Sequence, residues 1–174
     1  MTFLYIVYAL VALVIVLLVM ALFLPSGYHV EKTIIIQKPV NWVMERVANL
    51  HYYASWNPWQ QSDPGTKMEI TGTPKVPGHK YHWEGKKVGI GNLTLRDIDA
   101  KHVHFDLQFI KPFKAEANDN WLFEEWGNDE TKVTWQNDGD LPYPIARLMG
   151  PSLNKTLNRQ FVEGLNNLKK LCEG

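Results

Sequence analysis

The stretch KHVHFDLQFI, residues 101–110, alternates between polar and apolar side chains along its length. Successive side chains of a β-strand point to opposite faces of a sheet, so this alternation separates the two kinds. One face would carry Val103, Phe105, Leu107 and Phe109, and the other His102, His104, Asp106 and Gln108. The stretch therefore predicts a strand of an antiparallel sheet that is buried on one face and solvated on the other.

Similar alternation continues on both sides of this stretch and is interrupted by turn signals. The breaks stand at Asp63-Pro64-Gly65, Pro77-Gly78, Glu84-Gly85, Ile98-Asp99, Lys111-Pro112, Gly127-Asn128 and Asp138-Gly139. They delimit about six strands, whose inward positions include Tyr81 with Trp83, Leu93 with Leu95, and Trp121 and Phe123 opposite Val133 and Trp135. The β-branched segment 29–37 predicts one further strand ahead of these.

After Pro144 the apolar spacing changes to three or four residues, which is the period of a helix. The stripe consists of Leu153, Leu157, Phe161, Leu165 and Leu168 and predicts a long C-terminal helix. Its apolar face needs an apolar surface to cover, and the concave face of the sheet is the one available. A shorter helix is predicted after Pro39, with Val40, Val43, Met44 and Val47 on one face, and helical structure should stop near Asn57.

Several short motifs accompany this order of strand, short helices, six strands and long helix. They are Tyr28-His29-Val30-Glu31, Trp56-Asn57-Pro58-Trp59, Asp63-Pro64, Gly89-x-Gly91, Lys111-Pro112-Phe113, Thr131-Lys132-Val133-Thr134-Trp135 and Phe161-Val162-Glu163-Gly164-Leu165. Order and motifs together resemble the SRPBCC (START-like) superfamily, in its bacterial membrane-anchored, polyketide cyclase/dehydrase-like branch. The resemblance implies an α+β helix-grip fold. A curved antiparallel sheet of about seven strands would wrap on the long C-terminal helix, preceded by one N-terminal transmembrane helix.

Residues 3–24 carry no charge and form a run of 22 positions. At ~1.5 Å rise per residue a helix of that length crosses a hydrocarbon core of roughly 30 Å. The run predicts a single-pass membrane anchor, and a cleaved signal peptide is the alternative. Against cleavage stand the missing basic n-region and the lack of an A-x-A-like site before Pro25. We expect an anchor and linker over residues 1–27 and one helix-grip domain over 28–174.

The resemblance implies the bacterial inner membrane as the location, but the side that the domain faces stays open. Lys32 and Lys38 follow the apolar run and give only a weak positive-inside bias. The chain has 18 basic and 18 acidic residues without a run of like charge, so we expect no nucleic-acid partner. The single cysteine, Cys172, excludes an internal disulfide.

Signals for chemistry are sparse. His102, His104 and Asp106 share a strand face, but that face is the solvated one, so no metal site is predicted. There is no Gly-x-Ser-x-Gly elbow, and no cofactor is expected. His79 shares a face with Tyr81 and Trp83 and is the one candidate for an acid or base inside the fold.

Members of the superfamily enclose a cavity between sheet and long helix and often hold an apolar molecule there. In this chain the predicted cavity lining is Tyr81, Trp83, Leu93, Phe105, Leu107, Phe109, Trp121, Phe123, Trp135, Leu157 and Phe161, with Trp56 and Trp59 at the mouth. The alternative is that these side chains simply fill a core. Gly89 and Gly91 would either curve their strand or open volume beside it.

Three functions follow from these alternatives. The first is a membrane-anchored binding module that holds a lipid-like or aromatic small molecule in the cavity. The second is a polyketide cyclase-like or hydrolase-like enzyme that uses the same cavity, which requires an ionisable group facing the lumen. The third is a structural or regulatory interaction module with a filled core. The sequence favours the first function and leaves the question of catalysis open.

Overall fold

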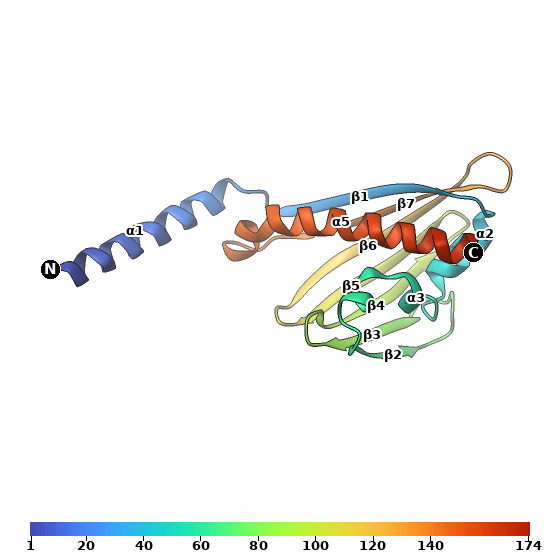
Figure 1. Cartoon of the computed structure of the whole chain (residues 1–174), viewed down its shortest axis with the longest axis horizontal. Coiled ribbons are helices and arrows are strands. Elements are labelled where there is room, and N and C mark those ends of the chain that lie inside the picture. Colours follow the sequence, from blue (N-terminus) through green and yellow to red (C-terminus); the bar gives the residue numbers. More distant parts are fainter.

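The computed structural model describes residues 1–174 and shows five helices and seven strands (Figure 1). The helices are α1 (Thr2–Phe23), α2 (Val40–Ala48), α3 (Tyr53–Trp56), α4 (Pro58–Ser62) and α5 (Ile145–Glu173). The strands are β1 (Gly27–Ile36), β2 (Lys67–Thr71), β3 (Lys80–Gly85), β4 (Gly89–Ile98), β5 (His102–Lys111), β6 (Ala115–Glu125) and β7 (Thr131–Asp140). The predicted order of elements is confirmed.

All strands belong to one antiparallel sheet in the order β1-β7-β6-β5-β4-β3-β2. Figure 1 shows α5 running along β1 across one face of this sheet. The predicted cross-strand pairs are present, because Trp121 lies opposite Trp135 and Phe123 opposite Val133. The α+β helix-grip fold is thereby confirmed.

The C-terminal half of α5 packs tightly on the sheet. Phe161, Leu165 and Leu168 are buried there. Gly164 permits the close approach, since a Cβ at this position would lie 2.9 Å from the Trp135 ring. Any larger residue would therefore push α5 away from the sheet at this point.

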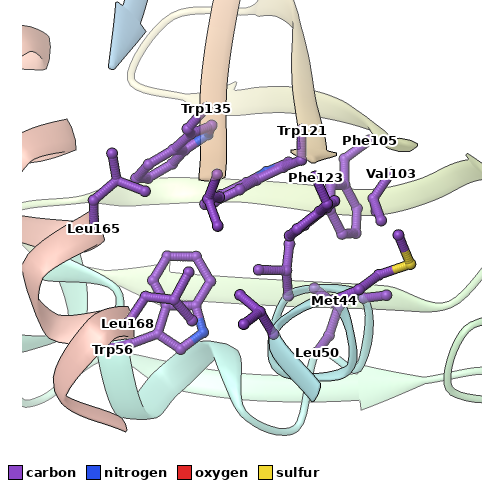
Figure 2. Close-up of a cluster of buried hydrophobic side chains, with 14 of the residues drawn as sticks. Met44, Leu50, Trp56, Val103, Phe105, Trp121, Phe123, Trp135, Leu165 and Leu168 are labelled. Atoms are coloured by element: carbon purple, nitrogen blue, oxygen red, sulfur yellow. The ribbon is translucent and has the colours of Figure 1, made fainter. Parts of the chain in front are cut away.

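Helices α2 and α3 close the same end of the sheet. The apolar face of α2 is buried as predicted, through Val43, Met44 and Val47. Figure 2 shows the resulting cluster, in which side chains of α2, α3, α5 and the sheet meet around Trp56. This end of the concave face is solid.

The structure corrects the roles predicted for two glycines, Gly139 and Gly91. The turn predicted at Asp138-Gly139 is wrong, because β7 continues to Asp140 and Gly139 pairs with both Tyr28 and Ala117. Its missing side chain makes room for the Tyr28 ring, which would lie 3.0 Å from a Cβ. Gly91 does not open free volume either, because a Cβ there would overlap the Trp83 ring.

Helix α1 extends away from the sheet (Figure 1). It is long and apolar enough to cross a membrane. Its most apolar stretch of 18 residues has a mean hydropathy of 3.2, and only 6% of that stretch is buried within the protein. Its last turns approach the start of α5, where the Tyr143 hydroxyl donates to the Leu18 carbonyl at 3.2 Å. One end of α1 therefore lies beside the N-terminal half of α5.

Candidate functional site

A cavity of about 630 Å³ lies between the sheet and the N-terminal half of α5. Its walls come from residues of β1 and of β3 to β7, from α3 and α4, and from the segment that leads into α5. Of its 31 lining residues 20 are hydrophobic, which is the composition of a site for an apolar small molecule. The outer face of the sheet has a larger hollow of about 900 Å³, but only 3 of its 13 lining residues are hydrophobic, so the inner cavity is the better candidate.

Eight of the predicted site residues line this cavity. From the sheet these are Tyr81, Trp83, Leu93, Leu107 and Phe109, from α5 Leu157 and Phe161, and from α4 Trp59. The alternation of β3, β4 and β5 places the sheet residues on the concave face, and the helical spacing of Leu157 and Phe161 turns both toward it. The structure therefore brings together the members of the set that lie near one end of the sheet.

The other five predicted residues do not reach the cavity and correct the sequence-based assignment. They are Phe105, Trp121, Phe123, Trp135 and Trp56, all nearly or fully buried in the solid end of the core (Figure 2). Trp121 stacks on Trp135 with ring centroids 4.5 Å apart, and Trp56 meets both rings edge-on. Trp56 is no mouth residue, because it is completely buried and its indole N–H donates to the Arg46 carbonyl at 3.1 Å.

His79 also differs from its predicted role. It is fully buried outside the cavity, accepts a hydrogen bond from the Leu50 amide at Nε2 (3.0 Å) and contacts the Thr71 carbonyl through Nδ1 (3.1 Å). These partners require the neutral ring with its proton on Nδ1, and burial lowers the pKa of His79. His79 therefore joins the loop after α2 to the edge of the sheet and has no access to a ligand.

His102 and His104 lie on the outer face of the sheet. The His102 ring is 3.0 Å from an Asp99 carboxylate oxygen, and the His104 ring is 2.7 Å from the Asn120 side-chain oxygen. Their partners are thus surface side chains of the neighbouring turn and strand.

Asp119, a carboxyl group in the cavity wall, is absent from the site residues predicted from the sequence. Asp119 lies on the same face of β6 as Trp121 and Phe123 and is 5% exposed. Its Oδ1 accepts the Trp121 indole N–H at 2.7 Å, and its Oδ2 accepts the Trp135 indole N–H at 2.8 Å and the Asn137 amide at 3.2 Å. Burial raises the pKa of Asp119 to about 6, and the three hydrogen bonds oppose that rise. The signal was present in the sequence, since a charged residue stands at an inward position of an otherwise apolar strand face.

Further polar groups belong to the cavity wall. The Tyr28 hydroxyl donates to the Asn137 side-chain oxygen at 2.8 Å, and the Tyr81 hydroxyl donates to Gln60 at 3.3 Å. Burial raises the pKa of Tyr28 to about 12 and that of Tyr53 well above 10, with the Asp119 charge adding to both. These phenols stay protonated at neutral pH.

The opposite end of the cavity is a mouth rimmed by exposed apolar side chains. Phe113 is 73% exposed, Ile145 66% and Met149 56%, and Tyr143 lies beside them. Tyr143 is also the residue that hydrogen-bonds to α1, so the mouth lies next to the end of the apolar N-terminal helix. The cavity thus has the buried carboxyl group of Asp119 at one end, and exposed apolar side chains together with the exposed charged residues Lys114, Glu116 and Asp140 toward its opening.

No family model matches the sequence, and no curated protein does either. Solved structures do match by shape. The Zhui aromatase/cyclase from a Streptomyces species superposes with a TM-score of 0.63 at 22% identity, over 84% of this chain and 94% of that one. A protein from Nitrosospira multiformis gives 0.60 at 17% identity, over 83% and 96% of the two chains.

DynU16, from the dynemicin biosynthetic locus, superposes with a TM-score of 0.57 at 15% identity, over 82% of this chain and 46% of that one. At these identities the matches establish the fold alone. The superposition and the seven-stranded sheet on a long C-terminal helix lead to one conclusion: the chain has the α+β helix-grip fold, which it shares with the Zhui aromatase/cyclase.

Proposed function

We propose that this protein is a membrane-anchored module that binds an apolar small molecule, lipid-like or aromatic, within the helix-grip domain of residues 28–174. The observation that carries the proposal is the cavity of about 630 Å³, with 20 hydrophobic residues among the 31 that line it. Burial of apolar ligand surface contributes about 25 cal/mol per Å², so a cavity of this kind binds mainly by the hydrophobic effect. The same cavity argues against an interaction module with a filled core.

The anchor in this proposal is α1. Its 22 residues carry no charge, and its side chains are almost all exposed, so it lacks an apolar surface within the chain to cover. In water an exposed apolar face of this size is strongly unfavourable, whereas a bilayer removes that cost. A retained α1 also holds the cavity close to a membrane and raises the effective concentration of any membrane-borne ligand.

The position of the mouth supports a ligand that comes from the bilayer. Phe113, Ile145 and Met149 are exposed around the opening, and Tyr143 joins this rim to Leu18 of α1. If α1 spans the membrane, Leu18 lies five residues, about 8 Å, before the end of α1, so a rim that reaches Leu18 through Tyr143 enters the outer part of the bilayer, where exposed apolar side chains insert favourably. A ligand then passes from lipid to cavity without crossing water.

Binding is favoured over catalysis by the surroundings of Asp119. Its three hydrogen-bond partners are two indoles and an amide, which do not exchange protons near neutral pH. The nearby phenols of Tyr28 and Tyr53 have raised pKa values and stay protonated. A carboxyl group held in this way orients a ligand and has no second group with which to share proton transfer.

The anchor is tested by the intact mass of the protein purified from membranes. Retention of α1 gives the mass of the whole 20.1 kDa chain, and the protein resists extraction by alkaline carbonate. A smaller mature mass, with the chain cut near Pro25, would show a cleaved signal peptide and overturn the anchor.

The ligand is tested by native mass spectrometry of the full chain released gently from its detergent micelle, with Ala117→Phe as the control. Ala117 lies on the cavity wall, two residues before Asp119, so a phenyl ring there fills the space that a ligand would use. We expect a stoichiometric apolar adduct on the wild type and none on the variant. A clean mass for both proteins, also after incubation with total membrane lipid, would contradict the binding function.

A further inference from the structure

Resting on the proposed binding function, we propose that Asp119 selects the ligand: it accepts a hydrogen bond from an amine or hydroxyl group on an otherwise apolar molecule. This assigns a class of ligand to the site. The molecule enters with its single polar donor at the buried end, and its apolar body extends toward the mouth. A carboxylate is rejected at this end of the cavity.

The first support is the number of hydrogen bonds that Asp119 makes. A carboxylate has about four acceptor positions, two on each oxygen. Oδ2 uses two of them, for the Trp135 indole and the Asn137 amide, whereas Oδ1 uses one, for the Trp121 indole. One acceptor position on Oδ1 is therefore left for a ligand, at a residue that lines the cavity.

The second support is charge. The groups that hydrogen-bond to Asp119 are neutral, and Asp119 forms no salt bridge; the one basic residue of the cavity lining, Lys114, follows Phe113 of the mouth. A buried carboxylate is costly unless it is paired, and indoles and an amide compensate the charge only in part. An ammonium group would complete the pairing, and a hydroxyl group would add a fourth hydrogen bond. A second carboxylate would add repulsion in a medium of low dielectric constant.

The third support is the direction of the cavity. Asp119 is 5% exposed, whereas Phe113 at the mouth is 73% exposed. Between them the wall is apolar and includes Leu107, Phe109 and Leu157. An elongated molecule with one hydrogen-bond donor at its end can place that donor at Asp119 and its apolar body among these side chains.

The position of Asp119 is also rigid. Its two indole partners belong to the solid end of the core, where Trp121 and Trp135 are stacked and nearly completely buried (Figure 2). A carboxyl group fixed before the ligand arrives loses little conformational entropy on binding. The solid core thus serves as the support of the recognition group.

The test compares four pyrene derivatives that share one apolar body: pyrenemethylamine, pyrenemethanol, methylpyrene and pyrenecarboxylic acid. The full chain is placed in nanodiscs of zwitterionic phosphatidylcholine, and energy transfer from tryptophan to pyrene reports binding. Trp59 and Trp83 line the cavity and serve as donors. Empty nanodiscs correct for partition of each probe into lipid.

For the wild type we expect the amine and the alcohol to bind roughly tenfold to a hundredfold tighter than methylpyrene, as for a hydrogen bond to a charged group. The carboxylate should bind weakest. In Asp119→Asn this preference over methylpyrene should largely disappear. Asp138→Asn removes a carboxylate from the outer face of β7, where it accepts a hydrogen bond from Asn118, and should leave the ranking unchanged.

Equal binding of all four probes to the wild type would overturn the role of Asp119 and leave the apolar binding function standing. Absence of binding by every probe, methylpyrene included, would overturn both. Asp119→Asn leaves one indole N–H without an acceptor and is a demanding substitution for the fold. The ranking on the wild type decides the question if that variant does not fold.

Discussion

The two ends of the concave face have similar sequences and opposite packing. Both carry inward aromatic side chains at alternate positions, but the end around Trp121 and Trp135 is solid and the end around Trp83 and Phe109 is hollow. The difference lies in what covers each end. Helix α3 and the loop after α2 add Trp56 and Leu50 to the solid end, while α4 and the N-terminal half of α5 cover the hollow one. Alternation along a strand therefore decides which side chains face inward, and the covering helices decide whether they meet a neighbour.

The largest effect should come from the two tryptophans of the Trp56-Asn57-Pro58-Trp59 motif. Trp56 is completely buried, whereas Trp59 is half-buried on the cavity wall. Trp56→Ala should lower the free energy of unfolding by about 3–5 kcal/mol, and Trp59→Ala by clearly less, since part of its surface already lacks neighbours. Chemical denaturation of both variants measures the difference. Equal losses would show that the two ends are packed alike.

The second effect concerns the boundary between the two ends, where Asp119 lies. Between its ordinary pKa of 3.8 and its raised pKa of about 6, folded Asp119 keeps a proton that the unfolded chain has lost. The folded state then binds more protons, so stability falls as the pH rises through this range, by up to about 3 kcal/mol.

Asp119→Asn should remove that fall. The difference between wild type and variant, taken from unfolding curves at several pH values, isolates Asp119 from carboxylates such as Asp99, whose pKa is lowered to about 2. If the unfolding free energies of wild type and variant changed with pH in parallel, Asp119 would not be buried in the way described.

The elements of this fold could be predicted from the sequence, but the boundary between core and cavity could not. The period of two along 101–110 and the helical stripe from Leu153 to Leu168 depend on local geometry, and both elements form as predicted. The boundary between core and cavity depends on how α2, α3 and α5 meet the sheet, which no local pattern encodes. Trp135 and Phe109 therefore had the same sequence signature and different surroundings.

Asp119 and His79 show the same limit for polar residues. In the sequence, Asp119 stands as a carboxylate at an inward position of a strand whose other inward residues are apolar. Its three hydrogen-bond donors, however, come from β6 and β7 and meet only in the folded sheet. His79 looked like a candidate base because it shares a strand face with Tyr81. Its partners, Leu50 and Thr71, lie in other segments and give it a structural role.

A third effect tests that structural role at the solid end. His79→Ala leaves the Leu50 amide and the Thr71 carbonyl without their partner, which should cost about 2–3 kcal/mol of unfolding free energy. His51 stacks on the His79 ring from the exposed side, so His51→Ala is a matched control with an expected loss below about 0.5 kcal/mol. Binding of methylpyrene should be the same in both variants, and a selective loss of binding in His79→Ala would contradict the separation of the two ends.

The smallest effect on stability should come from the rim of the hollow end. Phe113 is 73% exposed, so Phe113→Ser should change the free energy of unfolding by less than about 0.5 kcal/mol. The rate at which methylpyrene passes from a vesicle bilayer into the anchored protein should nevertheless fall, because a polar rim inserts less well into lipid. Stopped-flow energy transfer from tryptophan to pyrene measures that rate. An unchanged rate would show that the ligand does not enter past Phe113.

The most direct test of the account is a crystal structure of the protein under xenon pressure, because xenon enters apolar cavities and cannot enter a packed core. We expect xenon, or a co-purified molecule in its place, among Leu107, Phe109 and Leu157, and none between Trp56, Trp121 and Trp135. Continuous side-chain density at the first position, with the N-terminal half of α5 closed onto the sheet, would contradict a hollow end and the binding function derived from it.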